Sequence, residues 1–304
     1  MGDLKLAIKE VIGLEVDEFK VLREYNTSEY RNESKTLHEC HFLTTTKVKI
    51  VKGKPIRFGE HPLDIALFDP NAEPSKELQN MFRMHAQEQM LVKDFKKLVS
   101  AKLAEEKDIH ISPATMRIRE IYSSATPKNV YKDEKTLKHG AKHFVTSGTG
   151  LAITDLTHPE DNTEDNQVSI YLRRWYPSEY RLGKVEELTI SREDATVFVQ
   201  GLKDKAGLKE INFACTDYRT YELSVPGLMW QTEEDVGNMR MHSLGDGDLV
   251  IYKDPSETLK ELDDKERKEL KIQESKRKGM IMSRSRYNRK EKGITIKQEE
   301  DVKI

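Results

Sequence analysis

The chain has 304 residues, of which 36% are hydrophobic and 34% are charged. This length suits two or three domains, and the apolar share is too high for a chain that is disordered throughout. The formal net charge of -2 excludes a strong overall attraction for nucleic acid, and no apolar run approaches the ~20 residues that a membrane helix needs.

The chain opens with a small unit of one helix and two strands. Apolar residues recur at helical spacing within residues 3–13, and they alternate with polar residues along 19–25 and 47–51, as in strands. We expect residues 1–61 to form a unit that lacks its opening hairpin.

The second unit, residues 62–160, repeats and extends this order. Its predicted elements are a strand pair, a helix and two further strands, at 62–68, 79–85, 90–106, 116–122 and 150–156. The helix is the clearest of the chain, because Leu91, Phe95 and Leu98 begin an apolar stripe on one of its faces.

Two short matches indicate a repeat between these units. The segment LREY at 22–25 resembles IREI at 118–121, and KTL at 35–37 recurs at 135–137. A spacing of roughly 100 residues is too long for a solenoid and is typical of separate domains in a row.

A third unit, residues 167–254, follows a polar linker. We expect strands at 168–172, 185–190, 211–214 and 248–252, with a helix at 194–206. The shared order of strand, strand, helix, strand, short segment and strand favours an α+β fold. It suits a mixed sheet over one helix, the ubiquitin-like or β-grasp arrangement, with the first and last strands parallel. The sequence therefore predicts tandem ubiquitin-like domains.

The C-terminal part is highly charged. Asp254, Pro255 and Glu257 have the spacing of a helix start, so we expect a charged helix over 255–277. The remaining residues, 278–304, are basic and lack apolar periodicity, which predicts a flexible tail.

Catalytic and metal-binding patterns are absent from the sequence. Cys40 lies among His38, Glu39 and His41, but a thiolate needs an oriented base, and we interpret this segment as a solvated turn. Cys215 follows an apolar strand and is expected to be a buried packing residue. We expect no catalytic residues, no metal site and no cofactor. Two cysteines without zinc or redox spacing favour a reducing compartment, so we expect a cytoplasmic protein, with the nucleus as a second location.

Arg173, Arg174, Trp175 and Tyr176 form the best candidate for a partner-binding site. Aromatic and arginine side chains carry much of the binding energy at protein interfaces. In a strand over 168–172, the even-numbered residues should be buried, and Ser169, Tyr171 and Arg173 should face outward to continue this surface. The alternative is that Trp175 packs inside its own domain.

Several segments resemble a known family. They are IYLRRWYPSEYRL (170–182), DGDLVIYKD (246–254), ELDDKERKEL (261–270), ESKRK (274–278) and RKEKGI (289–294). They are similar to the C-terminal region of a large cysteine-type deubiquitinase of the ubiquitin-specific protease family. The resemblance implies a run of ubiquitin-like domains behind a catalytic domain. The cysteine and histidine boxes of that catalytic domain do not occur here, so no catalytic residue is carried over.

We therefore expect a non-catalytic interaction array that supports protein deubiquitination. Its partners would be the deubiquitinase catalytic domain, other ubiquitin-pathway proteins or substrates, and neither a membrane nor nucleic acid is expected. The alternative is an adaptor without a ubiquitin link, which would use its basic tail for nuclear or nucleic-acid contacts.

Overall fold

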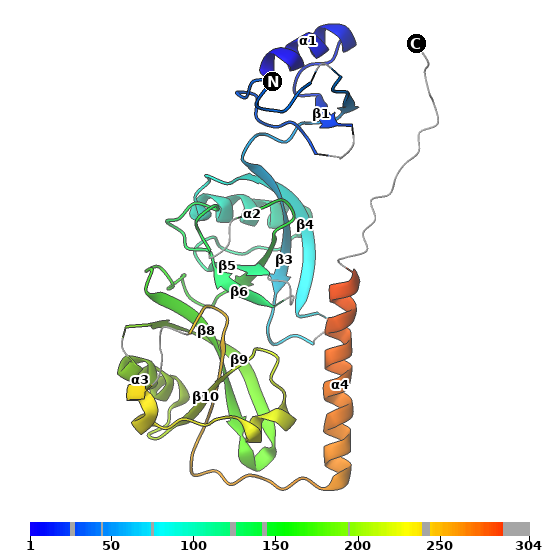
Figure 1. The fold of residues 1–304 in the computed structure, drawn as a ribbon. Helices are drawn as coiled ribbons and strands as arrows, with labels where there is room; N and C mark the ends of the chain where they lie inside the picture. The colour runs from blue at the N-terminus through cyan, green and yellow to red at the C-terminus, as the bar shows by residue number, and fades with distance from the viewer. Residues whose placement is uncertain are drawn as a thin grey trace.

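Three β-sheets follow one another in the described part of the chain, and Figure 1 shows the units that carry them arranged in a row. The computed structural model describes residues 1–24, 28–43, 45–73, 76–121, 126–141, 145–193, 195–238 and 244–287, with side chains as far as 277 in the last range. Within these ranges, no helix combines the length and the apolar character that a membrane span requires.

The first unit consists of helix α1 and a two-stranded antiparallel sheet. Its elements are α1 (Gly2–Ile12), β1 (Phe19–Arg23) and β2 (Val48–Lys52). Helix α1 ends as the sequence predicts, because Gly13 adopts φ 69°, a left-handed conformation that glycine tolerates well. Its small core includes Ile8, Phe19, Val21 and Cys40.

The second unit is a five-stranded mixed sheet with one helix. Its elements are β3 (Glu60–Phe68), β4 (Leu78–Gln87), α2 (Val92–Lys107), β5 (Met116–Ile121), β6 (Pro127–Val130) and β7 (Gly150–Asp155). The strand order is β4-β3-β7-β5-β6, with β3 parallel to β7 at the centre. Phe95, Val99 and Leu103 of α2 are fully buried in the core, as the apolar stripe of this helix predicts. Strand β6 was not predicted, because it is short and begins with proline.

The third unit repeats this plan with four strands. Its elements are β8 (Gln167–Tyr176), the 3₁₀-helix η1 (Pro177–Glu179), β9 (Arg181–Ser191), α3 (Ala195–Ala206), β10 (Asn212–Thr216), the 3₁₀-helices η2 (Glu222–Gly227) and η3 (Glu233–Asn238), and β11 (Leu249–Lys253). The order is β10-β11-β8-β9, and β8 is parallel to β11. In both units the first and last strands are therefore central and parallel.

Strand β8 is buried on both faces, which corrects the expectation of an outward face. Val168, Ile170 and Leu172 pack in the core beneath α3, as predicted. Ser169 and Tyr171 do point to the opposite face, but both are fully buried. That face is covered by the second unit, which no local pattern in the strand can indicate.

Helix α4 (Asp264–Tyr287) begins nine residues later than predicted, since the prediction placed its start at 255. The Asp254 carboxylate accepts hydrogen bonds from the backbone and hydroxyl of Ser256, which makes a local turn instead of a helix cap. The cap is Asp263, whose carboxylate accepts the Glu266 N–H at 2.8 Å while the Glu266 carboxylate accepts the Asp263 N–H at 3.1 Å. This reciprocal capping box fixes the helix start.

The predicted flexible tail also needs correction. Residues 278–287 continue α4, although they were expected to be flexible. Residues 288–304, which hold the RKEKGI segment and the end of the basic stretch, lie outside the described residues.

Candidate functional site

The second and third units meet through an apolar cluster. Phe68 of β3 and Ala152 of β7 pack with Tyr171, Leu249 and Ile251 of the third unit. The rings of Phe68 and Tyr171 are 6.1 Å apart and meet edge to face. The buried face of β8 is therefore part of a junction between two units.

Buried charges lie beside this cluster. Arg117 and Arg119 of β5 are 1% and 0% exposed, respectively. The Arg117 guanidinium donates to Glu160 at 3.0 Å and to Asp161 at 2.6 Å, and it also pairs with Glu187 of β9. Buried charges persist only when they are paired and hydrogen-bonded, so this arrangement depends on all of its partners.

Arg119 connects the same two units. Its guanidinium pairs with Glu187 at 2.8 Å and lies over the Tyr171 ring, 4.7 Å from the centroid. It also donates to the backbone oxygens of Lys128 and Ser169. Burial raises the pKa of Glu187, but the charges of Arg119 and Arg117 outweigh this effect and hold the pKa below its ordinary value.

Further hydrogen bonds cross the junction at its edges. The Asn71 side chain donates to the Val185 oxygen at 2.8 Å and accepts the Val185 N–H at 2.7 Å. The Tyr218 hydroxyl donates to Glu77 at 2.6 Å. These contacts join the second and third units into one body over residues 60–253.

Sequence reasoning noticed IREI at 118–121 only as a repeat. The signal that could have identified Arg117 and Arg119 is the presence of two arginines at alternate positions in an apolar strand. Such a spacing places both guanidinium groups on one face of the sheet. Their partner Glu187 lies 68 residues from Arg119 and has no local signature.

The predicted partner-binding segment is largely enclosed. A β-bulge between Arg173 and Trp175 shifts the register, and Trp175 is only 1% exposed. Its ring packs edge to face on Tyr180, with centroids 5.2 Å apart. Arg174 pairs with Glu257 at 2.8 Å and stacks over Tyr176. The location of Trp175 thus agrees with the alternative interpretation, in which this residue packs inside the protein. Binding of a partner by the whole segment stays a prediction.

Arg173 lies apart from these contacts. Its guanidinium lines a polar cavity of about 430 Å³ between the second unit, the third unit and α4. The Nε atom donates to the Gly183 oxygen at 3.0 Å.

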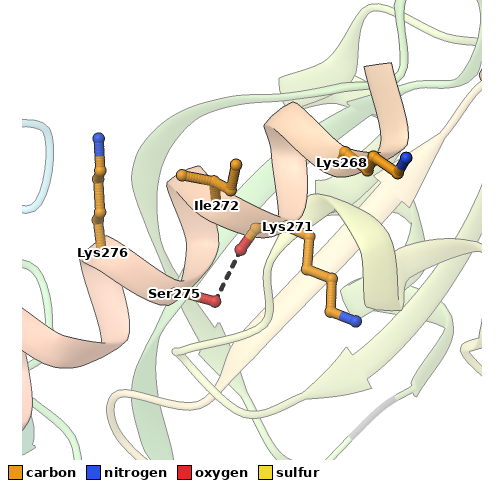
Figure 2. Close-up of a pocket in the computed structure, with 5 residues that line it drawn as sticks. All are labelled: Lys268, Lys271, Ile272, Ser275 and Lys276. Carbon is orange, nitrogen blue, oxygen red and sulfur yellow. Dashed lines mark hydrogen bonds between the residues drawn. The ribbon is translucent and has the colours of Figure 1, made fainter. Parts of the chain in front are cut away.

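The surface of α4 offers a more open site. Lys268, Lys271, Ile272, Ser275 and Lys276 line a hollow of about 600 Å³ (Figure 2). The Ser275 hydroxyl donates a hydrogen bond to the backbone oxygen of Lys271. All five residues belong to one helix, so a ligand here would be contacted from one side only. The opposite side of α4 is fixed to η2, where Glu274 accepts the Leu223 N–H at 2.8 Å.

The two cysteines are in different environments. His38, Glu39 and His41 are exposed in a turn, as predicted, but Cys40 among them is buried in the core of the first unit. Cys215 is exposed on the edge strand β10, where it was expected to be buried. Desolvation of the Cys215 thiol by the surrounding protein, and secondarily the negative charge of Asp248, raise its pKa to about 11. The thiol therefore stays protonated at neutral pH.

In the ranges that the structure describes, no group of three or more His, Cys, Asp or Glu side chains is placed to hold a metal ion.

Comparisons with known proteins place the chain in a family. A sequence model described as "Ubiquitin carboxyl-terminal hydrolase 47 C-terminal" matches residues 67–297, which cover the second unit from the end of β3, the third unit and α4. The chain is 26% identical to ubiquitin carboxyl-terminal hydrolase 47 of Mus musculus and of Homo sapiens, in each case over 97% of the chain and 22% of the relative. The protein of the same name from Drosophila melanogaster is 22% identical over 97% of the chain and 20% of its own length.

The extent of these matches defines what the chain corresponds to. It spans about a fifth of the length of the curated relatives that it matches. The matching family model describes a C-terminal region, in agreement with the resemblance of segments 170–182 and 246–254 to this part of a deubiquitinase. The chain therefore belongs to the family of C-terminal regions of ubiquitin carboxyl-terminal hydrolase 47.

Proposed function

We propose that the chain is a non-catalytic array of ubiquitin-like modules that supports protein deubiquitination by docking on a deubiquitinase catalytic domain or on its substrates. The observation that carries the proposal is the match of residues 67–297 to the C-terminal region of a ubiquitin hydrolase. In such a chain, the structure serves to hold surfaces in place for other proteins.

The strand order supports the ubiquitin-like part of this proposal. In the second unit a hairpin leads into a helix, and the last strand returns to the centre of the sheet, parallel to the first. The third unit has the same order without the fourth strand. We assign one module to residues 62–160, one to 167–254 and an incomplete one to 1–61.

The junction supports the docking part. Flexible linkers let neighbouring domains move independently, whereas a paired and buried cluster such as Arg117, Arg119 and Glu187 holds them at one spacing. A fixed pair of modules presents a surface wider than either module alone. Such a body can bind a partner without the entropy loss of ordering two separate domains.

The proposal is tested with the human relative from which the matching C-terminal region has been removed. We expect the chain to bind this truncated enzyme in interferometry and to alter its KM or kcat on a fluorogenic ubiquitin substrate when added in trans. The chain alone should give no turnover. Absence of both binding and any kinetic effect would contradict the docking proposal.

A matched variant separates docking from nonspecific effects. Glu187→Gln removes the charge that joins the two units, so it should weaken docking if the fixed junction matters. Lys209→Gln changes the charge of an exposed residue in the third unit and should leave docking unchanged. Equal loss of binding in both variants would argue against a role for the junction.

A further inference from the structure

The polar cavity beside Arg173 is built from several separate parts of the chain. Its lining includes residues 70–73 and 77, the β8–β9 hairpin, the 218–221 segment and α4. Four arginines contribute to it, namely Arg173, Arg181, Arg219 and Arg277. Its volume of about 430 Å³ lies within the range of small-ligand sites.

Arg173 is the half-buried cation of this cavity. Its Nε hydrogen bond to Gly183 orients the guanidinium, and the two terminal nitrogens form no hydrogen bond or ion pair with any residue in the part of the chain that the structure describes. Burial lowers the pKa of Arg173 and outweighs the raising effects of Glu222, Tyr218 and Glu77. The positive charge is thus desolvated without a direct counter-ion.

Three other enclosed arginines of this protein, unlike Arg173, form ion pairs with carboxylates. Arg119 pairs with Glu187 at 2.8 Å, Arg117 with Asp161 at 2.6 Å, and Arg174 with Glu257 at 2.8 Å. A desolvated guanidinium without a carboxylate is unfavourable, and an anion from outside would compensate it.

The carboxylates near the cavity have partners other than Arg173. Glu77 accepts the Tyr218 hydroxyl, Glu179 pairs with Arg181 at 2.8 Å, and Glu222 lies 3.5 Å from Arg277. Glu73 and Glu77 line the cavity, but the lining also holds four arginines and Lys184, so its charge is positive on balance.

We propose that this cavity binds a phosphoryl group carried by a protein partner, with Arg173 contacting the anion from within and Arg219 and Arg277 closing around it. A phosphoryl group brings a charge of about -1.5 to -2 and three strong acceptor oxygens, and it matches the forked donors of several arginines. A single carboxylate has two acceptor oxygens and one charge, and therefore satisfies fewer of them.

The inference rests on the proposed function in one respect, because the phosphoryl group is taken to arrive on a docked protein. Contact with the 218–221 segment and α4 together would also couple partner binding to the position of this helix. The cavity can be tested without any partner, so a failed docking experiment and a failed ligand titration are separate results.

The test is a titration of the full chain with N-acetyl-O-phosphoserine amide, followed by NMR of the arginine side chains. We expect saturable shifts at Arg173 and Arg219, and binding weaker by about tenfold or more in Arg173→Gln, as the loss of a charged hydrogen-bond donor implies. N-acetylserine amide should not bind. Lys209→Gln, which removes one positive charge from the same unit, should bind like the unchanged chain.

Two further arms decide the outcome. If Arg173→Gln lowers the melting temperature, Arg219→Gln is titrated in its place. Independently of these variants, the phosphoserine amide should raise the melting temperature of the unchanged chain by mass action. Inorganic phosphate should bind more weakly than the phosphoserine amide. Equal or tighter binding of inorganic phosphate, no saturable binding, or unchanged affinity in both arginine variants would overturn the proposal.

Discussion

Arg119 of β5 forms an ion pair with Glu187 of β9 at 2.8 Å, across the junction of the second and third units. The arginine side chain is 0% exposed and the glutamate 12%, so water screens neither charge effectively. The two residues belong to different sheets, so this buried ion pair holds the two sheets together.

Removal of the Glu187 charge should therefore destabilise the protein strongly. Glu187→Gln leaves Arg117 and Arg119 buried with one fewer counter-ion, and breaking a buried pair in this way costs about 3–5 kcal/mol. Urea denaturation measures the loss. Asp165→Asn is the matched control, because it breaks the exposed pair with Lys135 and should cost about 0–1 kcal/mol. Similar losses in the two variants would contradict the buried role of Glu187.

Acid should weaken the same junction. Arg119 and Arg117 hold the pKa of Glu187 below its ordinary value of 4.5 despite burial, which acts in the opposite direction. Since the folded pKa is lower than the unfolded one, the stabilisation is complete above pH 4.5 and is lost as the pH falls through the folded pKa. Denaturation curves from pH 7 to about pH 3 should show a larger loss in the unchanged chain than in Glu187→Gln. Parallel pH profiles would refute the assignment.

Trp175 should behave as a core residue. It is 1% exposed and packs with Tyr180, so Trp175→Ala should destabilise the third unit by about 3–5 kcal/mol. Met229→Ala, at a side chain that is 85% exposed, should change stability by less than about 0.5 kcal/mol. A Trp175→Ala variant that melts normally but loses partner binding would instead support the interface interpretation.

The start of α4 can be tested by its caps. Asp263→Ala removes the carboxylate that accepts the Glu266 N–H, and it should cost about 1 kcal/mol and fray the first turn. Asp254→Ala affects only the turn at Ser256 and should leave helix protection intact. Amide hydrogen exchange at residues 264–270 distinguishes the two, and faster exchange in Asp254→Ala alone would place the cap where the sequence first suggested it.

Local patterns predicted local elements well. The left-handed stop at Gly13 depends on neighbours within a few residues and appears as predicted. In the apolar stripe of α2, Phe95 is buried as predicted, but Leu98 is 46% exposed. The capping box at Asp263 and Glu266 was also present in the sequence, but the proline at 255 gave a stronger start signal. The helix is capped at Asp263, where the two side chains of the capping box each accept the backbone N–H of the other residue.

The junction could not be predicted in the same way. Tyr171 alternates along β8 as a surface residue would, and only the approach of Phe68, over 100 residues earlier, makes that face an interior. Likewise, Trp175 continues the alternation of Tyr171 and lies in the same apolar cluster, while Arg173 between them lines the cavity. Register shifts and contacts between units depend on tertiary packing, which a pattern of two-residue alternation does not contain.

Kinetics of the human relative without its C-terminal region, with and without this chain in trans, test the docking account most directly. Steady-state hydrolysis of a fluorogenic ubiquitin substrate should show a saturable change in KM or kcat as the chain is added, and Glu187→Gln should shift the midpoint to higher concentration. A rate that is independent of the chain at every concentration, or turnover by the chain alone that Cys40→Ala abolishes, would contradict the account.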